Sequence, residues 1–101
     1  MNPVGVTKRD DFHPFFLFSM VYTVYVIQSE VDKRLYKGMT EHIDIRLHEH
    51  NSGRNFSTSP FRPWKLVYTK EFNDSIEARN WEKYLKSGKG REMLKKLLMV
   101  L

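Results

Sequence analysis

The stretch that decides the fold is VYTVYVIQ, at residues 21–28. It is rich in β-branched and aromatic residues, which favour strands. Apolar side chains occupy both of its faces, so we predict a central strand that is covered on each side. A polar turn, SEVDKR at 29–34, separates it from LYKGM at 35–39, which we predict to be the returning strand of a hairpin.

The returning strand places neighbouring residues on opposite faces. By the two-residue period of a strand, Tyr36 and Gly38 share one face, whereas Lys37 points to the other. A glycine inside a strand usually marks a bulge or a close approach of another group to the backbone. We therefore expect one of these two features at Gly38.

A helix is predicted after the hairpin, over about residues 43–51. Thr40 is a candidate for its N-cap, and Gly53 is a candidate for its end. Arg46 and His50 are spaced i and i+4, so they share one face of this helix.

The rest of the chain predicts one more strand and two more helices. The turn-rich segment 51–64 leads to an alternating strand at 65–72. Asn73 or Asp74 caps a helix that ends at Gly88. Four leucines spaced i, i+3, i+4 and i+7 then predict an amphipathic last helix. They are Leu94, Leu97, Leu98 and Leu101. The order β-β-α-β-α-α predicts an α/β protein of the α+β kind, a small three-stranded, mainly antiparallel sheet flanked by helices.

Length and composition suit one small domain. We expect a domain over residues 21–101 and a poorly ordered N-terminal arm over residues 1–20, in a chain of 101 residues. The absence of cysteine excludes a disulfide framework and a thiolate metal site, and it suits the cytoplasm. No apolar run approaches the ~20 residues that a membrane span needs, so we expect no membrane insertion.

Basic residues exceed acidic ones, 17 to 12, which gives a formal net charge of +5 and a pI near 9.6. Such a balance suits a polyanionic partner, although many basic proteins bind no nucleic acid. The candidate DNA-binding cations lie around the turn-rich loop and near the junction of the last two helices. They are Arg54, Arg62, Lys65, Lys86 and Lys89. Ordinary solvated charge is the alternative for each of them.

Two tyrosines, Tyr25 and Tyr36, are the first candidates for chemistry. They lie on the two predicted strands of the hairpin, which can place their hydroxyls side by side to hold a water or a phosphate oxygen. The alternative is simple packing, because aromatic residues in strands mostly bury a ring and hydrogen-bond a hydroxyl.

Arg46 and His50 are the next candidates. The planar guanidinium of Arg46 binds phosphate oxygens and stabilises negative charge that develops in a transition state; its alternative is an ion pair with Glu49. His50 is a candidate general base, phosphate donor or metal ligand, and its alternative is a surface histidine near a helix end. We expect His42 and His48 at the surface.

Glu82 is the candidate metal ligand. It lies close to the apolar side of its predicted helix, and a half-buried carboxylate needs a cation. One carboxylate together with water and phosphate oxygens is a normal environment for Mg²⁺. The alternative is a salt bridge to Arg79 or Lys86.

The order and spacing of these residues resemble the GIY-YIG nuclease superfamily. TVY at 23–25 and YKG at 36–38 are similar to its two motifs, and EARNWEKYLK at 77–86 is similar to its glutamate helix. The tract HNSGRNFSTSPFRPWKLVY at 50–68 also resembles the small stand-alone branch, which is similar to the N-terminal nuclease domain of the bacterial excinuclease C subunit. The resemblance covers residues 21–98.

The resemblance implies a DNA endonuclease that hydrolyses phosphodiester bonds with one divalent ion, Mg²⁺ or Mn²⁺. It implies that Tyr25, Tyr36, Arg46 and His50 are catalytic and that Glu82 is both catalytic and the metal ligand. The implied substrate is branched or damaged DNA, cleaved in repair or recombination. The alternative is a module of the same fold that binds nucleic acid without cleaving it, or that depends on a protein partner for its DNA affinity.

Two residues depart from the family motifs. Thr23 replaces the glycine of the first motif, and Lys37 replaces the usual isoleucine of the second. The face of Lys37 should pack against a core, so this side chain either extends to solvent or marks a face that is open to DNA. Neither departure removes a chemical residue, so we do not expect an inactive site.

Overall fold

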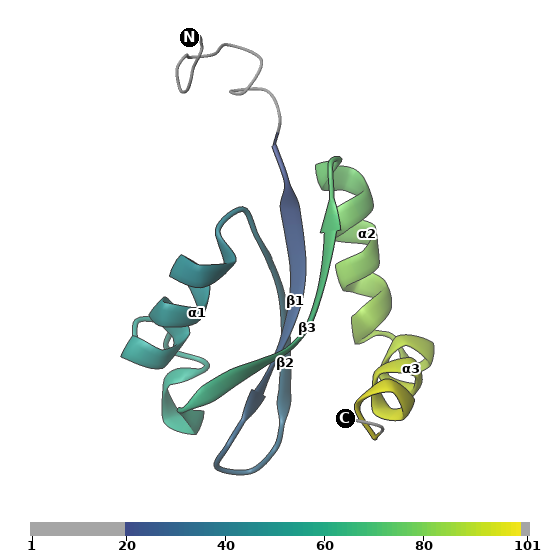
Figure 1. Ribbon diagram of the computed structural model, residues 1–101. Helices are drawn as coiled ribbons and strands as arrows, with labels where there is room; N and C mark the ends of the chain where they lie inside the picture. The colour runs from purple at the N-terminus through teal and green to yellow at the C-terminus, as the bar shows by residue number, and fades with distance from the viewer. Residues whose placement is uncertain (1–19, 100–101) are drawn as a thin grey trace, which may run out of the picture.

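The computed structural model describes residues 20–99, and Figure 1 shows their arrangement. The predicted N-terminal arm lies outside the described residues, apart from Met20. The elements follow in the order β1 (Tyr22–Ser29), β2 (Leu35–Thr40), α1 (Ile43–Ser52), the short 3-10 helix η3 (Ser59–Phe61), β3 (Trp64–Phe72), α2 (Ser75–Lys86) and α3 (Gly88–Met99). This order confirms the predicted α+β fold.

The three strands form an antiparallel sheet in the order β2-β1-β3. The central place of β1 confirms the prediction from its two apolar faces. Helix α1 covers one face of the sheet, and helices α2 and α3 cover the other (Figure 1). Within residues 20–99, no helix combines the length and the hydropathy that crossing a membrane requires.

Alternate side chains of β1 enter two separate cores. The core under α2 and α3 is built on Val24, Val26, Ala78, Leu85 and Leu94, all of them fully buried. The core under α1 is built on Tyr25, Ile27 and Trp64, with Tyr36, Ile43, Leu47 and Phe61 packed against them. One strand therefore supports both layers of the molecule.

The start of α1 corrects one expectation. The N-cap residue is His42, which makes no capping hydrogen bond with its side chain, so Thr40 is not the N-cap. The Thr40 hydroxyl instead accepts from the backbone N–H of His42 at 3.1 Å, within the turn that joins β2 to α1. Gly53 ends the helix as predicted, in the left-handed conformation at φ 87°.

The junction of α2 and α3 corrects another expectation. Asp74 caps α2 as predicted, accepting from the N–H of Ile76 at 2.8 Å. Ser87, rather than Gly88, interrupts the helix, because its backbone is extended at φ −79° and ψ 169°. The Ser87 hydroxyl accepts from the N–H of Gly90 at 3.2 Å, so this serine also caps α3, whose first residue is Gly88.

Candidate active site

Tyr25 lies in the middle of β1, and its side chain is 1% exposed. Its Cα pairs with that of Gly38 on the edge strand β2, and its ring lies over this glycine. A Cβ at Gly38 would lie 2.5 Å from the phenol oxygen, too close for any side chain to fit. Gly38 therefore provides the predicted close approach, whereas the irregularity in the sheet lies between Val26 and Ile27 where β1 pairs with β3.

His50 is the direct partner of Tyr25. The phenol oxygen lies 2.9 Å from Nε2 of the imidazole, and Nδ1 lies 2.9 Å from the hydroxyl of Thr58. His50 is fully buried, so the alternative of a surface histidine is wrong. Its ring contacts the rings of both tyrosines, with centroid distances of 5.9 Å to Tyr25 and 5.0 Å to Tyr36. His42 and His48 are exposed, as predicted.

The contacts of Thr58 assign the proton on the imidazole. Burial and the nearby Arg46 charge lower the pKa of His50, so its ring is neutral at pH 7, with one donor and one acceptor nitrogen. The Thr58 hydroxyl donates to the carbonyl of Asn55 at 3.4 Å, which leaves its oxygen to accept from Nδ1. We therefore assign the proton to Nδ1, so Nε2 is left to accept the phenol proton of Tyr25.

Thr58 is the residue of this site that the sequence did not reveal. It is 1% exposed, and its carbonyl accepts from the indole N–H of Trp64 at 2.8 Å. Asn51 holds the backbone of the same tryptophan, accepting from its N–H at 2.6 Å and donating to its carbonyl at 3.0 Å. In sequence, Thr58 stands in a turn-rich tract between Ser57 and Ser59, and no spacing separates it from these neighbours.

Arg46 lies beside the same phenol. Its Nη1 donates to the carboxylate of Glu49 at 2.9 Å, which is the ion pair that the sequence offered as the alternative. Burial raises the pKa of Tyr25 above its usual value near 10, and the hydrogen bond and charge of Arg46 act in the opposite direction. The pair with Glu49 occupies one edge of the guanidinium and leaves further N–H groups for a ligand.

Glu82 lies on α2, on the other side of the sheet from α1. Its charge contributes to raising the pKa of Tyr25, so the two groups are electrostatic neighbours. The Glu82 side chain is 17% exposed, and its carboxylate pairs with Nζ of Lys86 at 3.2 Å. The alternative ion pair with Lys86 is therefore present, on a carboxylate that is largely buried as the sequence predicted.

The donor set at Glu82 suits an oxygen-preferring ion. Residues 20–99 contain no group of three or more His, Cys, Asp and Glu side chains that could hold a metal between them. An ion on Glu82 would take its other ligands from water and phosphate oxygens, which Mg²⁺ accepts readily. Lys86 would have to leave its ion pair with Glu82 for this ion to bind, and its side chain is 56% exposed to solvent.

Three candidate side chains are tied to the Tyr25 phenol, and a fourth lies next to them. His50 contacts the phenol directly, Arg46 acts on it through charge and a hydrogen bond, and Glu82 acts on it through charge, while the ring of Tyr36 contacts that of His50. The sheet brings together residues that are far apart in the sequence. Chemically, the arrangement offers a proton acceptor, a guanidinium and a carboxylate that act on one hydroxyl.

The five predicted DNA-binding cations are exposed, and they form two groups. Arg54, Arg62 and Lys65 lie around η3, on the side of α1, whereas Lys86 and Lys89 lie where α2 meets α3. Lys37 of β2, whose face the sequence offered as one that is open to DNA, lies close enough to Arg91 and Lys86 for their charges to lower its pKa, after the larger effect of burial.

A family model described as the GIY-YIG catalytic domain matches residues 21–96. The UPF0213 protein BH0048 from Bacillus halodurans, whose structure was solved by NMR in solution, is similar, with 33% sequence identity. The match covers 77% of this chain and 85% of that chain, with a TM-score of 0.49. The search of curated proteins gave no significant match.

Proposed function

Because the chain belongs to the GIY-YIG catalytic domain family, we propose that it is a metal-dependent DNA endonuclease. Membership of this nuclease family supports the cleavage of nucleic acid in general. The observation that carries the proposal is the contact of Tyr25 with His50, made beside Arg46 and Glu82. Together they offer a proton acceptor, a cation for phosphate oxygens and a carboxylate for a metal ion, which are groups that can promote phosphodiester hydrolysis.

In the proposed mechanism, Tyr25 and His50 move a proton. Since burial raises the pKa of Tyr25, the phenol keeps its proton at neutral pH and is a poor base alone. We propose that the phenol oxygen takes a proton from the attacking water while its own proton passes to Nε2 of His50, 2.9 Å away. Burial and Arg46 lower the pKa of the imidazole, so the imidazolium is short-lived and returns its proton readily.

The remaining residues bind and orient the phosphate. Arg46 is proposed to bind its oxygens and to stabilise the charge that develops on them during attack. The Tyr36 hydroxyl is proposed to donate to a further phosphate oxygen. Glu82 is proposed to hold one Mg²⁺ or Mn²⁺, which when bound neutralises the phosphate and the leaving oxygen. The expected products carry 5′-phosphate and 3′-hydroxyl ends.

The small size of the domain bears on its substrate. A domain of this size has little surface for reading a long base sequence, so we propose that it recognises DNA structure. Branched or damaged DNA, as it arises in repair or recombination, is the proposed substrate.

A test of the activity compares wild type with Glu82→Gln on nicked, flapped, branched and linear DNA, with Mg²⁺ or Mn²⁺. We expect wild type to cleave at least one substrate and Glu82→Gln to lose the activity while retaining its fold by circular dichroism. Glu77→Gln, on the exposed first turn of the same helix, is the matched control and should cleave normally. Equal background cleavage by wild type and Glu82→Gln would show that the chain is not an enzyme of this kind.

One observation favours the second candidate, a DNA-binding module that is inactive or needs a partner. The ammonium of Lys86 pairs with the carboxylate that would bind the metal. Under this alternative, the pair persists until a partner protein or a particular DNA moves Lys86 away. DNA binding without cleavage by the purified chain, followed by Glu82-dependent cleavage when a cell extract is added, would support it.

A further inference from the structure

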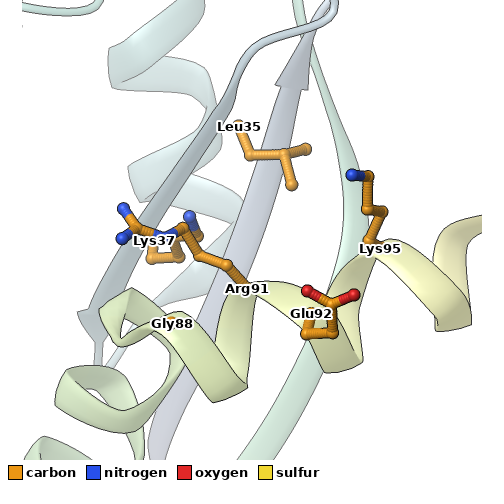
Figure 2. Close-up of a pocket in the computed structure, with 6 residues that line it drawn as sticks. All are labelled: Leu35, Lys37, Gly88, Arg91, Glu92 and Lys95. Atoms are coloured by element: carbon orange, nitrogen blue, oxygen red, sulfur yellow. The ribbon is translucent and has the colours of Figure 1, made fainter.

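A second basic site lies on the far side of β2 from the tyrosines. It is a pocket of about 390 Å³ between β2 and the first turns of α3, lined by Leu35, Lys37, Gly88, Arg91, Glu92 and Lys95. In Figure 2 the side chain of Arg91 extends from α3 towards Lys37 on the strand, while Glu92 and Lys95 lie further along the helix. Three of the lining side chains are cationic and one is anionic.

Within the part of the chain that the structure describes, the three cations that line this pocket are accompanied by one carboxylate, that of Glu92. Among residues 20–99, no carboxylate forms an ion pair with Lys37, Arg91 or Lys95. Lys37 is half-buried, and burial together with the charges of Arg91 and Lys86 lowers its pKa. Like charges held together in a partly dry pocket repel one another, and a bound anion relieves that repulsion.

The shape and lining of the pocket indicate which anion it takes. A guanidinium beside an ammonium matches the oxygens of a phosphate better than it matches a single-atom anion. The apolar wall at Leu35 and the open space above Gly88, where no atom lies within 4 Å of a Cβ position, leave room for a sugar beside the phosphate. A phosphate that belongs to a nucleotide chain therefore fits this pocket.

The pocket adjoins the candidate active site. Lys37 and Tyr36 are neighbours on the edge strand β2, and they point to opposite faces of the sheet. Lys86 links the two sites, because it pairs with Glu82 and its charge also acts on Lys37. A DNA strand that passes over the β2 edge would present one phosphate to each site.

We propose that this pocket binds one backbone phosphate of the DNA substrate, close along the strand to the phosphate that is cleaved. The proposal rests on the proposed nuclease function in one respect, because that function is the reason for choosing DNA as the ligand. It gives Lys37, the residue that departs most from the family motif, a role in holding the substrate strand.

The test measures DNA binding by the full chain in EDTA, so that no cleavage occurs. Fluorescence anisotropy would follow an oligonucleotide substrate in which one linkage at a time is a neutral methylphosphonate. We expect Lys37→Gln and Arg91→Gln each to weaken binding of unmodified DNA about tenfold. Each should also reduce the slope of log K against log salt concentration by about 1.

The matched control variants also lose one positive charge, but at positions outside the pocket. Lys96→Gln on α3 and Arg79→Gln on α2 remove exposed cations that do not line the pocket, and they should change binding much less. Lys37→Arg should retain most of the affinity. Thermal unfolding of every variant would exclude a loss of fold.

The decisive result is whether the loss of affinity caused by a methylphosphonate at one linkage depends on the presence of Arg91. We expect one methylphosphonate position to weaken binding to wild type but not to Arg91→Gln. If no position shows this coupling, the proposal is wrong, even if Glu82-dependent cleavage is observed. If the coupling is present and wild type cleaves nothing, the proposed activity fails and the phosphate site stands. A site that responds to inorganic phosphate in NMR titration, but shows no linkage coupling, would bind free phosphate and overturn the assignment to DNA.

Discussion

The two faces of β1 differ in the chemistry that holds their side chains in place. On the side of α2 and α3, Val24 and Val26 pack into a core whose buried members are all aliphatic, and the hydrogen bond from Trp81 Nε1 to the Tyr68 hydroxyl, 3.0 Å long, lies at its partly buried edge. On the side of α1, Tyr25 packs beside His50 and Thr58, which are joined by hydrogen bonds. Apolar packing tolerates changes of detail, whereas a buried chain of polar groups loses its function when one member is missing. The two faces should therefore respond differently to mutation.

The largest expected effect is on the polar face. Tyr25→Phe keeps the ring over Gly38 and removes only the hydroxyl that moves the proton. Cleavage should fall about 10²- to 10⁴-fold, the usual contribution of acid–base catalysis, while the free energy of unfolding falls by about 1–3 kcal/mol for the lost hydrogen bond. Single-turnover rates and urea unfolding would measure the two effects. Near-normal cleavage by this variant would remove Tyr25 from the mechanism.

The opposite outcome is expected on the aliphatic face. Leu94→Ala leaves a cavity in the core under α2 and α3, and it should lower the free energy of unfolding by about 2–5 kcal/mol. The rate per folded molecule should stay close to that of wild type, because Leu94 belongs to the core under α2 and α3, on the opposite side of β1 from Tyr25 and His50. Chemical denaturation and cleavage at low temperature would separate the effects. A large loss of rate in the folded protein would contradict the division between the two faces.

A smaller effect is expected at Thr58. Thr58→Val keeps the shape of the side chain but leaves Nδ1 of His50 without a partner, at a cost of about 1–3 kcal/mol for the buried polar group. Cleavage should fall about tenfold, as the imidazole loses its preferred tautomer. Nitrogen-15 NMR of His50 should show a mixture of tautomers, and Thr58→Ser should restore both the tautomer and the rate. An unchanged spectrum in the valine variant would make Thr58 merely a packing residue.

The smallest effect is a pH dependence of stability. In the unfolded chain His50 gains a proton near pH 6.5, whereas in the folded protein burial lowers its pKa, so it stays neutral to a lower pH. Between these two values the unfolded state binds more protons, so stability falls as the pH falls, by at most about 1.4 kcal/mol per pH unit for one group. Urea unfolding from pH 7.5 to 5 should show a steeper loss for wild type than for His50→Gln. Parallel curves would contradict this assignment.

The sequence predicted the elements better than their contacts. The β-branched and aromatic residues on both faces of 21–28 were sufficient to predict the central strand, and the two-residue period of the next strand was sufficient to predict the faces of Tyr36, Lys37 and Gly38. Local chemistry also identified Asp74 as a cap. These features depend on residues that are close together in the chain.

The contacts that the sequence could not predict are made between segments that are far apart in the chain. His50 was placed on the same helix face as Arg46, but its burial depends on how α1 lies on the sheet and on the loop that brings Thr58 back to it. Likewise, the pocket at Lys37 exists only because Ser87 turns the chain so that Arg91 faces β2. The family resemblance supplied the roles of Tyr25 and Glu82, and it said nothing about these contacts.

The position of Tyr25 in β1 limits where the chain can tolerate the insertion or deletion of a residue. Insertion or deletion of a single residue early in β1 would turn every later side chain of the strand to the opposite face. Tyr25 would then enter the aliphatic core, and a valine would face His50, so one change would damage both layers at once. The turn at 30–34 has no such constraint, because length changes there leave the alternation of both strands intact. Homologues should therefore vary in length at this turn while keeping the number of residues in β1 constant.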